Sequence, residues 1–159
     1  MLVSIKDDFD LKKIAASGQC FRVRRFEDDS YRFVTGEHIL YISRERKGQF
    51  SVSCDVEEWQ KIWRTYFDLD RCYSDMFEQN RDKHSFVREA MMFGRGLRVL
   101  RQDPWEMLVS FIISQRKSIP AISKSVEMLA EKFGHPIDTP RETVFTFPTP
   151  RELEQVSSD

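Results

Sequence analysis

Hydrophobic and polar residues alternate along much of the first 54 residues, which is the period of a half-buried β-strand. Clusters of turn-forming residues at 27–30, 35–37 and 46–48 separate these runs. A short helix that begins near Leu11 and ends at Gly18 is expected before the strand at 21–24. The pattern predicts an antiparallel sheet with strands over about 21–24, 31–34, 39–42 and 50–54.

From Asp55 onward, apolar residues recur every three or four positions, which is the period of an α-helix. Asp55 and Glu58 form a D-x-x-E helix start, and Asp70 is a candidate cap for a later helix. The apolar residues of each helix, Trp59 and Trp63 among them, are expected to face a core. The pattern predicts helices over about 56–67, 71–77 and 84–93.

A helical hairpin is predicted between Gly96 and Gly134. Asp103 is suited to cap the first helix, and residues 107–113 are apolar almost all round, which indicates a helix buried on most sides. Five polar residues, 114–118, follow without an apolar anchor. Ser118 can cap a second helix that Gly134 ends. From pattern alone, this is a helical hairpin with a solvated turn.

Beyond Gly134, four prolines indicate an irregular segment, followed by a short helix over about 151–156. Ser157-Ser-Asp159 has the composition of a helix N-cap, so we expect the chain to continue into a further helix. The chain is therefore predicted to be α+β, with an antiparallel sheet domain and flanking helix over 1–60 and a helical domain over 61–159.

Composition excludes some classes of function. The formal net charge of −1 over 159 residues is not that of a polycation, so any nucleic-acid contact must come from a local patch. Three cysteines without a C-x-x-C pair indicate reduced thiols and a cytoplasmic protein. No signal peptide or membrane-spanning run is present, so no membrane partner is expected. The three histidines lack metal-ligand spacing, so no metal and no cofactor is expected.

No catalytic constellation follows from residue spacing. The chain has no G-x-S-x-G, Walker loop, H-E-x-x-H or dinucleotide fingerprint. The adjacent acids Asp28 and Asp29 are an acid/base pair on one interpretation, but ordinary turn chemistry explains them better. The main charge feature is a basic excess around the hairpin, which is able to face phosphates: Arg95, Arg98, Arg101, Arg116, Lys117 and Lys124.

Three ordered segments resemble the 8-oxoguanine DNA glycosylases, within the helix-hairpin-helix glycosylase superfamily. Ser17–Arg22 is S-G-Q-C-F-R, where the family has S-G-Q-x-F-R. Tyr66–Asp70 is Y-F-D-L-D, where the family has Y-F-x-L-D. The hairpin resembles the family through G-L-R-V-L-R-Q-D-P at 96–104, F-I-I-S at 111–114, Ile119 and V-E-M-L at 126–129.

The resemblance implies a TATA-binding-protein-like sheet domain followed by the first helices of an all-α glycosylase domain, truncated before the helix-hairpin-helix. It implies a base-excision-repair enzyme that flips 8-oxoguanine out of double-stranded DNA. A lysine, helped by an aspartate, would attack C1′ and form a Schiff base that permits AP-lyase strand cleavage. Both residues would follow Asp159, so the 159-residue chain alone is expected to be inactive. Lys117 does not match the nucleophile.

The resemblance also implies two site roles. Gly18 matches the glycine whose carbonyl accepts a hydrogen bond from N7–H of 8-oxoguanine. Gln115, Arg116, Lys117 and Ser118 match the DNA-binding loop that fills the gap left by the flipped base. Eukaryotic members carry asparagines in this loop and an arginine where this chain has Ala121, so the sequence looks bacterial, of a cytoplasmic, nucleoid-associated protein. Arg116 is the candidate donor to an orphaned cytosine.

Two other functions remain open at this stage. Alkylpurine (3-methyladenine-type) DNA glycosylases share the architecture and a related loop. A non-catalytic DNA-binding module is the alternative from another class. Because a helical domain that lacks its second half would leave apolar helix faces exposed, self-association of the chain is also expected.

Overall fold

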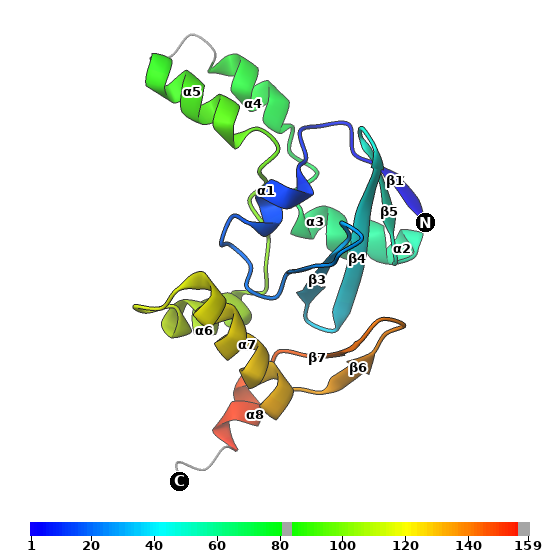
Figure 1. Ribbon diagram of the computed structural model, residues 1–159, viewed down its shortest axis with the longest axis vertical. Helices are drawn as coiled ribbons and strands as arrows, with labels where there is room; N and C mark the ends of the chain where they lie inside the picture. Colours follow the sequence, from blue (N-terminus) through cyan, green and yellow to red (C-terminus); the bar gives the residue numbers. More distant parts are fainter. Residues whose placement is uncertain (81–83, 156–159) are drawn as a thin grey trace. The chain divides into compact units, whose positions relative to one another are not determined.

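The computed structural model describes residues 1–80 and 84–155 (Figure 1). Its strands are β1 (Leu2–Ser4), β2 (Arg24–Arg25), β3 (Tyr31–Thr35), β4 (His38–Arg46), β5 (Gln49–Val52), β6 (Pro136–Asp138) and β7 (Thr143–Phe145). Its helices are α1 (Leu11–Ala15), α2 (Val56–Glu58), the π-helical η1 (Trp59–Trp63), α3 (Arg64–Tyr66), α4 (Tyr73–Gln79), α5 (Ser85–Gly94), α6 (Pro104–Ile113), α7 (Ile119–Phe133) and α8 (Pro150–Glu154).

Residue contacts divide the chain into two compact units. Unit 1 is Met1–Arg32 with Leu40–Arg101, and unit 2 is Phe33–Ile39 with Gln102–Asp159. The domain boundary near residue 60 that the sequence indicates stays a prediction.

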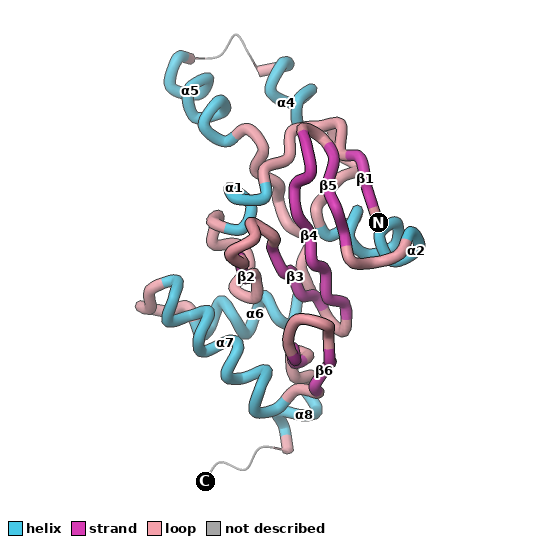
Figure 2. The backbone as a smooth tube through the Cα atoms, turned by 45° about the vertical axis from the view of Figure 1, so that its right-hand side comes forward, coloured by secondary structure: helices cyan, strands magenta, loops and turns pink. Residues whose placement is uncertain are grey.

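A five-stranded sheet has the order β1-β5-β4-β3-β2, and its α+β context confirms the predicted fold class (Figure 2). β1 and β4 both pair with β5 in antiparallel fashion. The pairing of β4 with β5 shifts register between Arg44 and Arg46, where an extra residue increases the local twist. Strand β1 was not predicted, because three residues are too few to show a period.

Aromatic rings form the centre of unit 1. The ring of Phe9 meets the rings of Phe50 and Phe67 edge-on, with centroids 5.2 and 5.3 Å away. Trp59 and Trp63 are both buried, and the Trp63 indole donates to Glu58 Oε1 at 2.9 Å. Their prediction as core residues is confirmed. The predicted helix over 56–67 is observed as α2, η1 and α3, with the π-helical turn placing both indoles inward.

The helices α4 and α5 do not bury their apolar residues as predicted. Neither helix has a buried residue, and Phe86 of α5, which was expected to face the core, is 78% exposed. Polar contacts attach this helix pair instead. Asp7 accepts hydrogen bonds from the first backbone N–H groups of α4, and Lys13 Nζ donates to two carbonyls at the end of α5. Asp70, the predicted cap, instead pairs with Arg64 at 2.7 Å.

In unit 2, α6 begins as predicted, because Asp103 Oδ1 accepts from the Glu106 N–H at 2.8 Å. The prediction that α6 is wrapped on most sides is wrong. Glu106 and Ser110 are its buried residues, and Phe111 is 66% exposed. The exposed apolar face of α6 consists of Met107, Leu108, Phe111 and Ile112.

Helix α7 packs through Ile122, Val126 and Ala130, and it ends where the sequence predicted. Gly134 ends α7 for a packing reason: a Cβ there would lie 1.9 Å from the Thr146 carbonyl oxygen. Its backbone is extended, with φ −90° and ψ −180°, so conformation does not require glycine at this position.

The segment after Gly134 is more regular than predicted. β6 and β7 pair as an antiparallel hairpin, and a capping box between Thr149 and Glu152 begins α8. Trp105 Nε1 donates to the Pro148 carbonyl at 2.8 Å, which ties α6 to the start of α8. The helix cap predicted at Ser157–Asp159 lies outside the described residues.

Candidate nucleic-acid interface

Gly18 lies in a tight turn that follows α1 in unit 1. Its φ is 74°, in the left-handed region that favours glycine. Ser17 Oγ donates to the Ile14 carbonyl at 2.7 Å and accepts from the Gln19 N–H at 3.3 Å. Within the described chain the Gly18 carbonyl accepts no hydrogen bond, and the residue is partly exposed. The turn therefore presents a carbonyl acceptor without an internal donor.

The side chain of Gln19 fastens this turn to a distant segment of unit 1. Its Nε2 donates to the Arg98 carbonyl at 2.9 Å, and its Oε1 accepts from the Leu100 N–H at 3.0 Å. The same Nε2 lies 3.1 Å from Ser17 Oγ. One amide thus pairs with two backbone groups of segment 98–100, as a neighbouring strand would.

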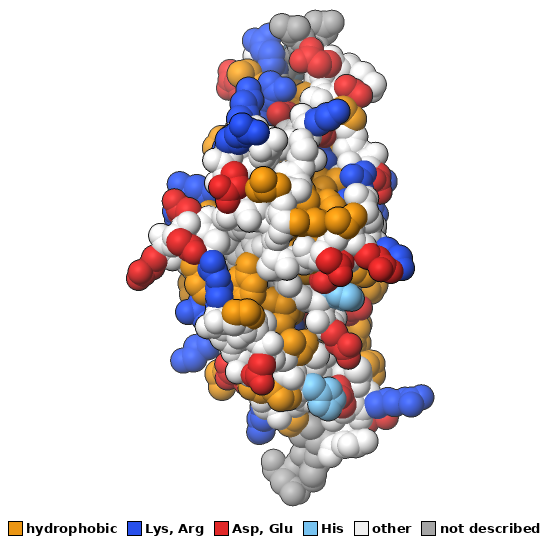
Figure 3. Space-filling view, turned by 90° about the vertical axis from the view of Figure 1, so that its right-hand side faces the viewer, with side chains coloured by type: hydrophobic (Ala, Val, Ile, Leu, Met, Phe, Trp, Pro, Cys, Tyr) orange, Lys and Arg blue, Asp and Glu red, His pale blue; other side chains and the backbone are white. Residues whose placement is uncertain are grey.

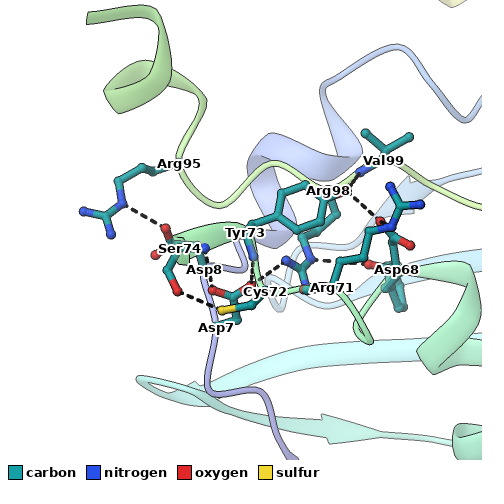
Figure 4. A network of polar contacts seen from close by, with 11 residues as sticks. Asp7, Asp8, Asp68, Arg71, Cys72, Tyr73, Ser74, Arg95, Arg98 and Val99 are labelled. Atoms are coloured by element: carbon teal, nitrogen blue, oxygen red, sulfur yellow. Dashed lines mark hydrogen bonds and ion pairs between the residues drawn. The ribbon is translucent and has the colours of Figure 1, made fainter. Parts of the chain in front are cut away.

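The side chain of Arg98 holds segment 98–100 to the rest of unit 1 (Figure 4). Its side chain is 0% exposed, and Nη1 lies 2.8 Å from Asp7 Oδ2. The guanidinium also lies over the ring of Tyr73, with 4.1 Å between Cζ and the ring centroid. Because a buried charge needs a partner, Asp7 and Arg98 depend on each other.

Asp7 is held ionised by the backbone of α4. Burial alone would raise its pKa, but hydrogen bonds from the Tyr73 and Ser74 N–H groups, at 2.6 and 3.0 Å, outweigh burial and hold the pKa well below its ordinary value. The carboxylate therefore acts as a helix cap supplied by a residue 66 positions earlier in the chain.

Tyr73 and Asp68 complete the network (Figure 4). The Val99 N–H donates to the Tyr73 hydroxyl at 3.1 Å, and that hydroxyl donates to Asp68 Oδ2 at 2.9 Å. Burial raises the pKa of Tyr73, so its hydroxyl stays protonated at neutral pH. Asp68 also accepts from Arg101 Nε at 3.2 Å. The segment 98–101 is thus hydrogen-bonded at almost every residue.

The predicted loop Gln115–Ser118 joins α6 to α7 in unit 2, and all four of its residues are exposed. Arg116 has a φ of 59°, which is uncommon for a residue other than glycine. Its guanidinium makes no hydrogen bond or ion pair with the described residues. Lys117 Nζ lies 3.4 Å from Ser125 Oγ. The loop therefore presents one cation without a partner at a turn with restricted backbone geometry.

The two predicted site regions belong to different units, with Gly18 in unit 1 and the loop in unit 2. The acid/base alternative is not supported by the geometry at 28–30. Asp28 accepts from the Ser30 backbone at 3.1 Å, and Asp29 pairs with Arg25. Both acids are turn residues, as the sequence indicated.

Residues 1–80 and 84–155 offer few other kinds of site. Within these ranges, no group of three His, Cys, Asp or Glu side chains could hold a metal ion. No helix in the same ranges is long and apolar enough to cross a membrane. The three cysteines, all within these ranges, form no disulfide bond with one another. Acidic and basic side chains lie side by side over the face drawn in Figure 3, in keeping with the net charge of −1.

Pattern reasoning did not assign a role to Gln19 or to Asp7. Gln19 stands within the S-G-Q motif, so the motif was the available signal for it. Asp7 stands in no recognisable pattern, because the helix that it caps begins 66 residues later.

Comparison with known proteins identifies the class of protein. The family model for the N-terminal domain of 8-oxoguanine DNA glycosylase matches residues 1–108. The N-glycosylase/DNA lyase of Saccharomyces cerevisiae is 36% identical over 89 residues, which are 55% of this chain and 23% of the yeast protein. Both matches are to the 8-oxoguanine DNA glycosylase class of proteins.

Solved structures agree over nearly the whole chain. MBOgg1, in complex with a low-affinity DNA ligand, superposes with a TM-score of 0.90 and 40% identity, over 98% of this chain and 54% of that one. The 8-oxoguanine glycosylase/lyase of Clostridium acetobutylicum, with double-stranded DNA containing cytosine opposite 8-oxoguanine, has a TM-score of 0.86 and 33% identity, over 99% and 57%.

The chain belongs to the 8-oxoguanine DNA glycosylase family and contains its N-terminal domain. It spans half or less of the length of the curated relatives that it matches.

Proposed function

We propose that the protein carrying this chain is an 8-oxoguanine DNA glycosylase/lyase that acts on double-stranded DNA. The chain would supply recognition of the damaged base and contacts to the duplex. The lysine nucleophile and its helper aspartate would lie outside these 159 residues, so the chain alone is expected to be inactive. The observation that carries the proposal is the Gly18 carbonyl, an acceptor without an internal donor in a turn fixed on both sides.

The chemistry of the lesion explains why such a carbonyl is useful. Guanine has a bare acceptor at N7, whereas 8-oxoguanine carries a hydrogen there and donates it. A carbonyl oxygen at that position therefore forms a hydrogen bond with the lesion and faces an acceptor in the normal base. When guanine occupies the site, the carbonyl oxygen is left without a donor, and the cost of that unpaired acceptor disfavours guanine relative to 8-oxoguanine.

The comparisons support this class over the alkylpurine alternative. The matched family model is that of 8-oxoguanine DNA glycosylase. The yeast N-glycosylase/DNA lyase and the two solved neighbours described above are 33–40% identical to this chain. The same matches disfavour a DNA-binding module without chemistry. A nicking assay on an 8-oxoguanine:cytosine duplex, with the protein expressed from its complete reading frame, tests the activity. Cleavage by the 159-residue chain itself would contradict the expected position of the lysine.

Gly18→Ala is expected to lower the preference for 8-oxoguanine over guanine by about tenfold, since a left-handed φ strains alanine and moves the carbonyl. Affinity for a duplex with a tetrahydrofuran abasic analogue, which has no base to contact, is expected to change much less. Binding titrations with duplexes that carry 8-oxoguanine, guanine or the abasic analogue measure both effects. Gly36→Ala is the matched control, because Gly36 also has a positive φ and open space around it. Equal losses on all duplexes would contradict the proposed carbonyl contact.

We also propose that the loop Gln115–Ser118 contacts the base left unpaired by flipping. The support is an exposed Arg116 whose left-handed backbone holds it at the tip of the α6–α7 turn. A guanidinium is a planar donor suited to the acceptor atoms that cytosine exposes when unpaired.

Arg116→Ala is expected to lower the preference for cytosine over adenine opposite the lesion by about tenfold, which is the range of one specific base contact. The salt dependence of binding, as log Kd against log salt, is expected to become shallower by less than about one. Arg151→Ala, which removes an exposed arginine of α8 in the same unit, is the control. If Arg116→Ala weakened binding equally for every opposite base, the arginine would be a phosphate contact only.

Self-association of the isolated chain remains a further proposal. Its support is the exposed apolar face of α6, since apolar surfaces of this kind commonly mark a protein contact.

A further inference from the structure

We propose that Gln19 is a positioning residue for lesion selection, because its side chain sets the direction in which the Gly18 carbonyl points. The inference rests on the proposed function and adds a residue to it. Gln19 itself would not contact the damaged base. It would act through the peptide bond that it shares with Gly18.

The geometry of that peptide bond gives the first step. The Gly18 carbonyl and the Gln19 N–H belong to one planar unit, and the described chain contains no cis peptide bond. In a trans peptide these two groups point in opposite directions. Because the Gln19 N–H donates to Ser17 Oγ, the Gly18 carbonyl points away from Ser17. Fixing the N–H therefore fixes the carbonyl.

The second step concerns the freedom of glycine. Gly18 is needed for the positive φ of the turn, but glycine has the widest range of backbone conformations. Left to itself, the turn would let the carbonyl swing among several directions. Ser17 and Gln19 flank the glycine, and each is bonded to a separate element: Ser17 to the end of α1, Gln19 to segment 98–100.

The third step is the specificity of the Gln19 amide. It donates to one carbonyl and accepts from the N–H two residues later, at 2.9 and 3.0 Å. Rotating the amide by 180° would place acceptor against acceptor and donor against donor, so only one orientation is favourable. One donated and one accepted hydrogen bond hold the Gln19 side chain in a single position against segment 98–100. The backbone of Gln19 is held with it.

The fourth step is that segment 98–100 is itself immobilised. The Arg98 side chain is buried against Asp7, and the Val99 N–H is bonded to the Tyr73 hydroxyl. Figure 4 shows these contacts of Arg98 and Val99. Gln19 therefore connects the turn to a part of unit 1 that is held by buried charge. A mobile partner would give the carbonyl no fixed direction.

The test uses Gln19→Met, which keeps the length of the side chain and removes both polar groups. The protein from the complete reading frame is titrated with three duplexes that carry 8-oxoguanine, guanine or a tetrahydrofuran abasic analogue opposite cytosine. Gln19→Met is expected to lower the affinity ratio of 8-oxoguanine to guanine by about tenfold, the size expected for loss of one oriented hydrogen bond. Affinity for the abasic duplex is expected to change by less than about twofold, because that duplex offers no N7–H.

Two further variants make the result decisive. Gln60→Met makes the same chemical change at an exposed position of η1 and is expected to leave all three affinities unchanged. Ser17→Ala removes the acceptor of the Gln19 N–H with a smaller structural change, and it is expected to lower the ratio in the same direction. If Gln19→Met does not fold, as judged by its thermal unfolding, Ser17→Ala carries the test.

The outcomes separate the two proposals. Loss of the ratio with retained abasic affinity supports the positioning role. An unchanged ratio in folded Gln19→Met or Ser17→Ala overturns that role and leaves the proposed function standing. Equal losses on the lesion and abasic duplexes also overturn it, since they would indicate a role in folding alone. No preference for 8-oxoguanine in the unsubstituted protein would overturn both proposals.

Discussion

Replacing Asp7 with alanine is expected to lower the free energy of unfolding by about 3–5 kcal/mol, the range measured when one partner of a buried ion pair is removed. Arg98 is the reason for this large effect. Its side chain is 0% exposed and Asp7 lies 2.8 Å away, so the substitution leaves a guanidinium away from water without its carboxylate. The first two N–H groups of α4 lose their acceptor in the same step.

The contribution of Asp7 is expected to depend on pH. Its pKa is lower in the folded chain than in the unfolded chain, so the folded state binds its proton less readily. By linkage, the stabilisation is fully present above the unfolded pKa of about 4 and is lost as pH falls through the folded value. The difference in stability between the unsubstituted chain and Asp7→Asn should therefore be constant above about pH 5 and shrink below about pH 4.

Urea unfolding followed by circular dichroism, at several pH values, measures both effects. Asp8→Ala is the matched control, because Asp8 pairs with Arg95, whose side chain is 49% exposed, at 2.8 Å. Such a surface pair contributes about 0–1 kcal/mol. A similar small loss in both variants would show that the Asp7–Arg98 pair is not a principal stabilising contact of unit 1.

Gly134→Ala is expected to destabilise unit 2 by about 3 kcal/mol, at the upper end of the usual cost of overpacking. A Cβ at this position would lie 1.9 Å from the Thr146 carbonyl oxygen and 2.8 Å from the Ala130 carbonyl oxygen. Both neighbours are backbone atoms, so no side chain can rotate to make room. Either α7 must end differently or the chain at Thr146 must move away, and the His135–Thr146 hydrogen bonds would then be lost.

Gly94→Ala provides the comparison. Gly94 ends α5, and nothing lies within 4 Å of a Cβ built there. Because alanine favours helix more than glycine does, this variant is expected to be neutral or slightly stabilising. Thermal unfolding of both variants shows whether destabilisation comes from crowding of the new Cβ at position 134 or from replacement of any glycine by alanine. Equal midpoints for Gly134→Ala and the unsubstituted chain would contradict the packing argument.

The strand predicted over 21–24 is observed as β2, at Arg24–Arg25 alone. Short-range signals were sufficient for the strands β3, β4 and β5, for Asp103 as a helix cap and for the end of α7 at Gly134. Each of these depends on residues within a few positions of one another, where period and capping chemistry act directly.

Inferences about which side of a helix is buried were less successful. The apolar residues of α5 and α6 were expected to be buried, yet Phe86 and Phe111 are exposed. Period identifies the apolar face of a helix, but whether that face is covered depends on elements elsewhere in space. In α6 the buried residues are instead Glu106 and Ser110.

The sequence by itself determined the α+β class, the family through S-G-Q-C-F-R and Y-F-D-L-D, and Gly18 and the 115–118 loop as candidate site residues. Only the tertiary structure decided what fixes the Gly18 turn. Gln19 reaches Arg98 and Leu100 across about eighty residues, and Asp7 reaches both Arg98 and the start of α4. Such contacts have no period and no local spacing, because they arise only when folding brings backbone groups and charges that are distant in the sequence close together in space.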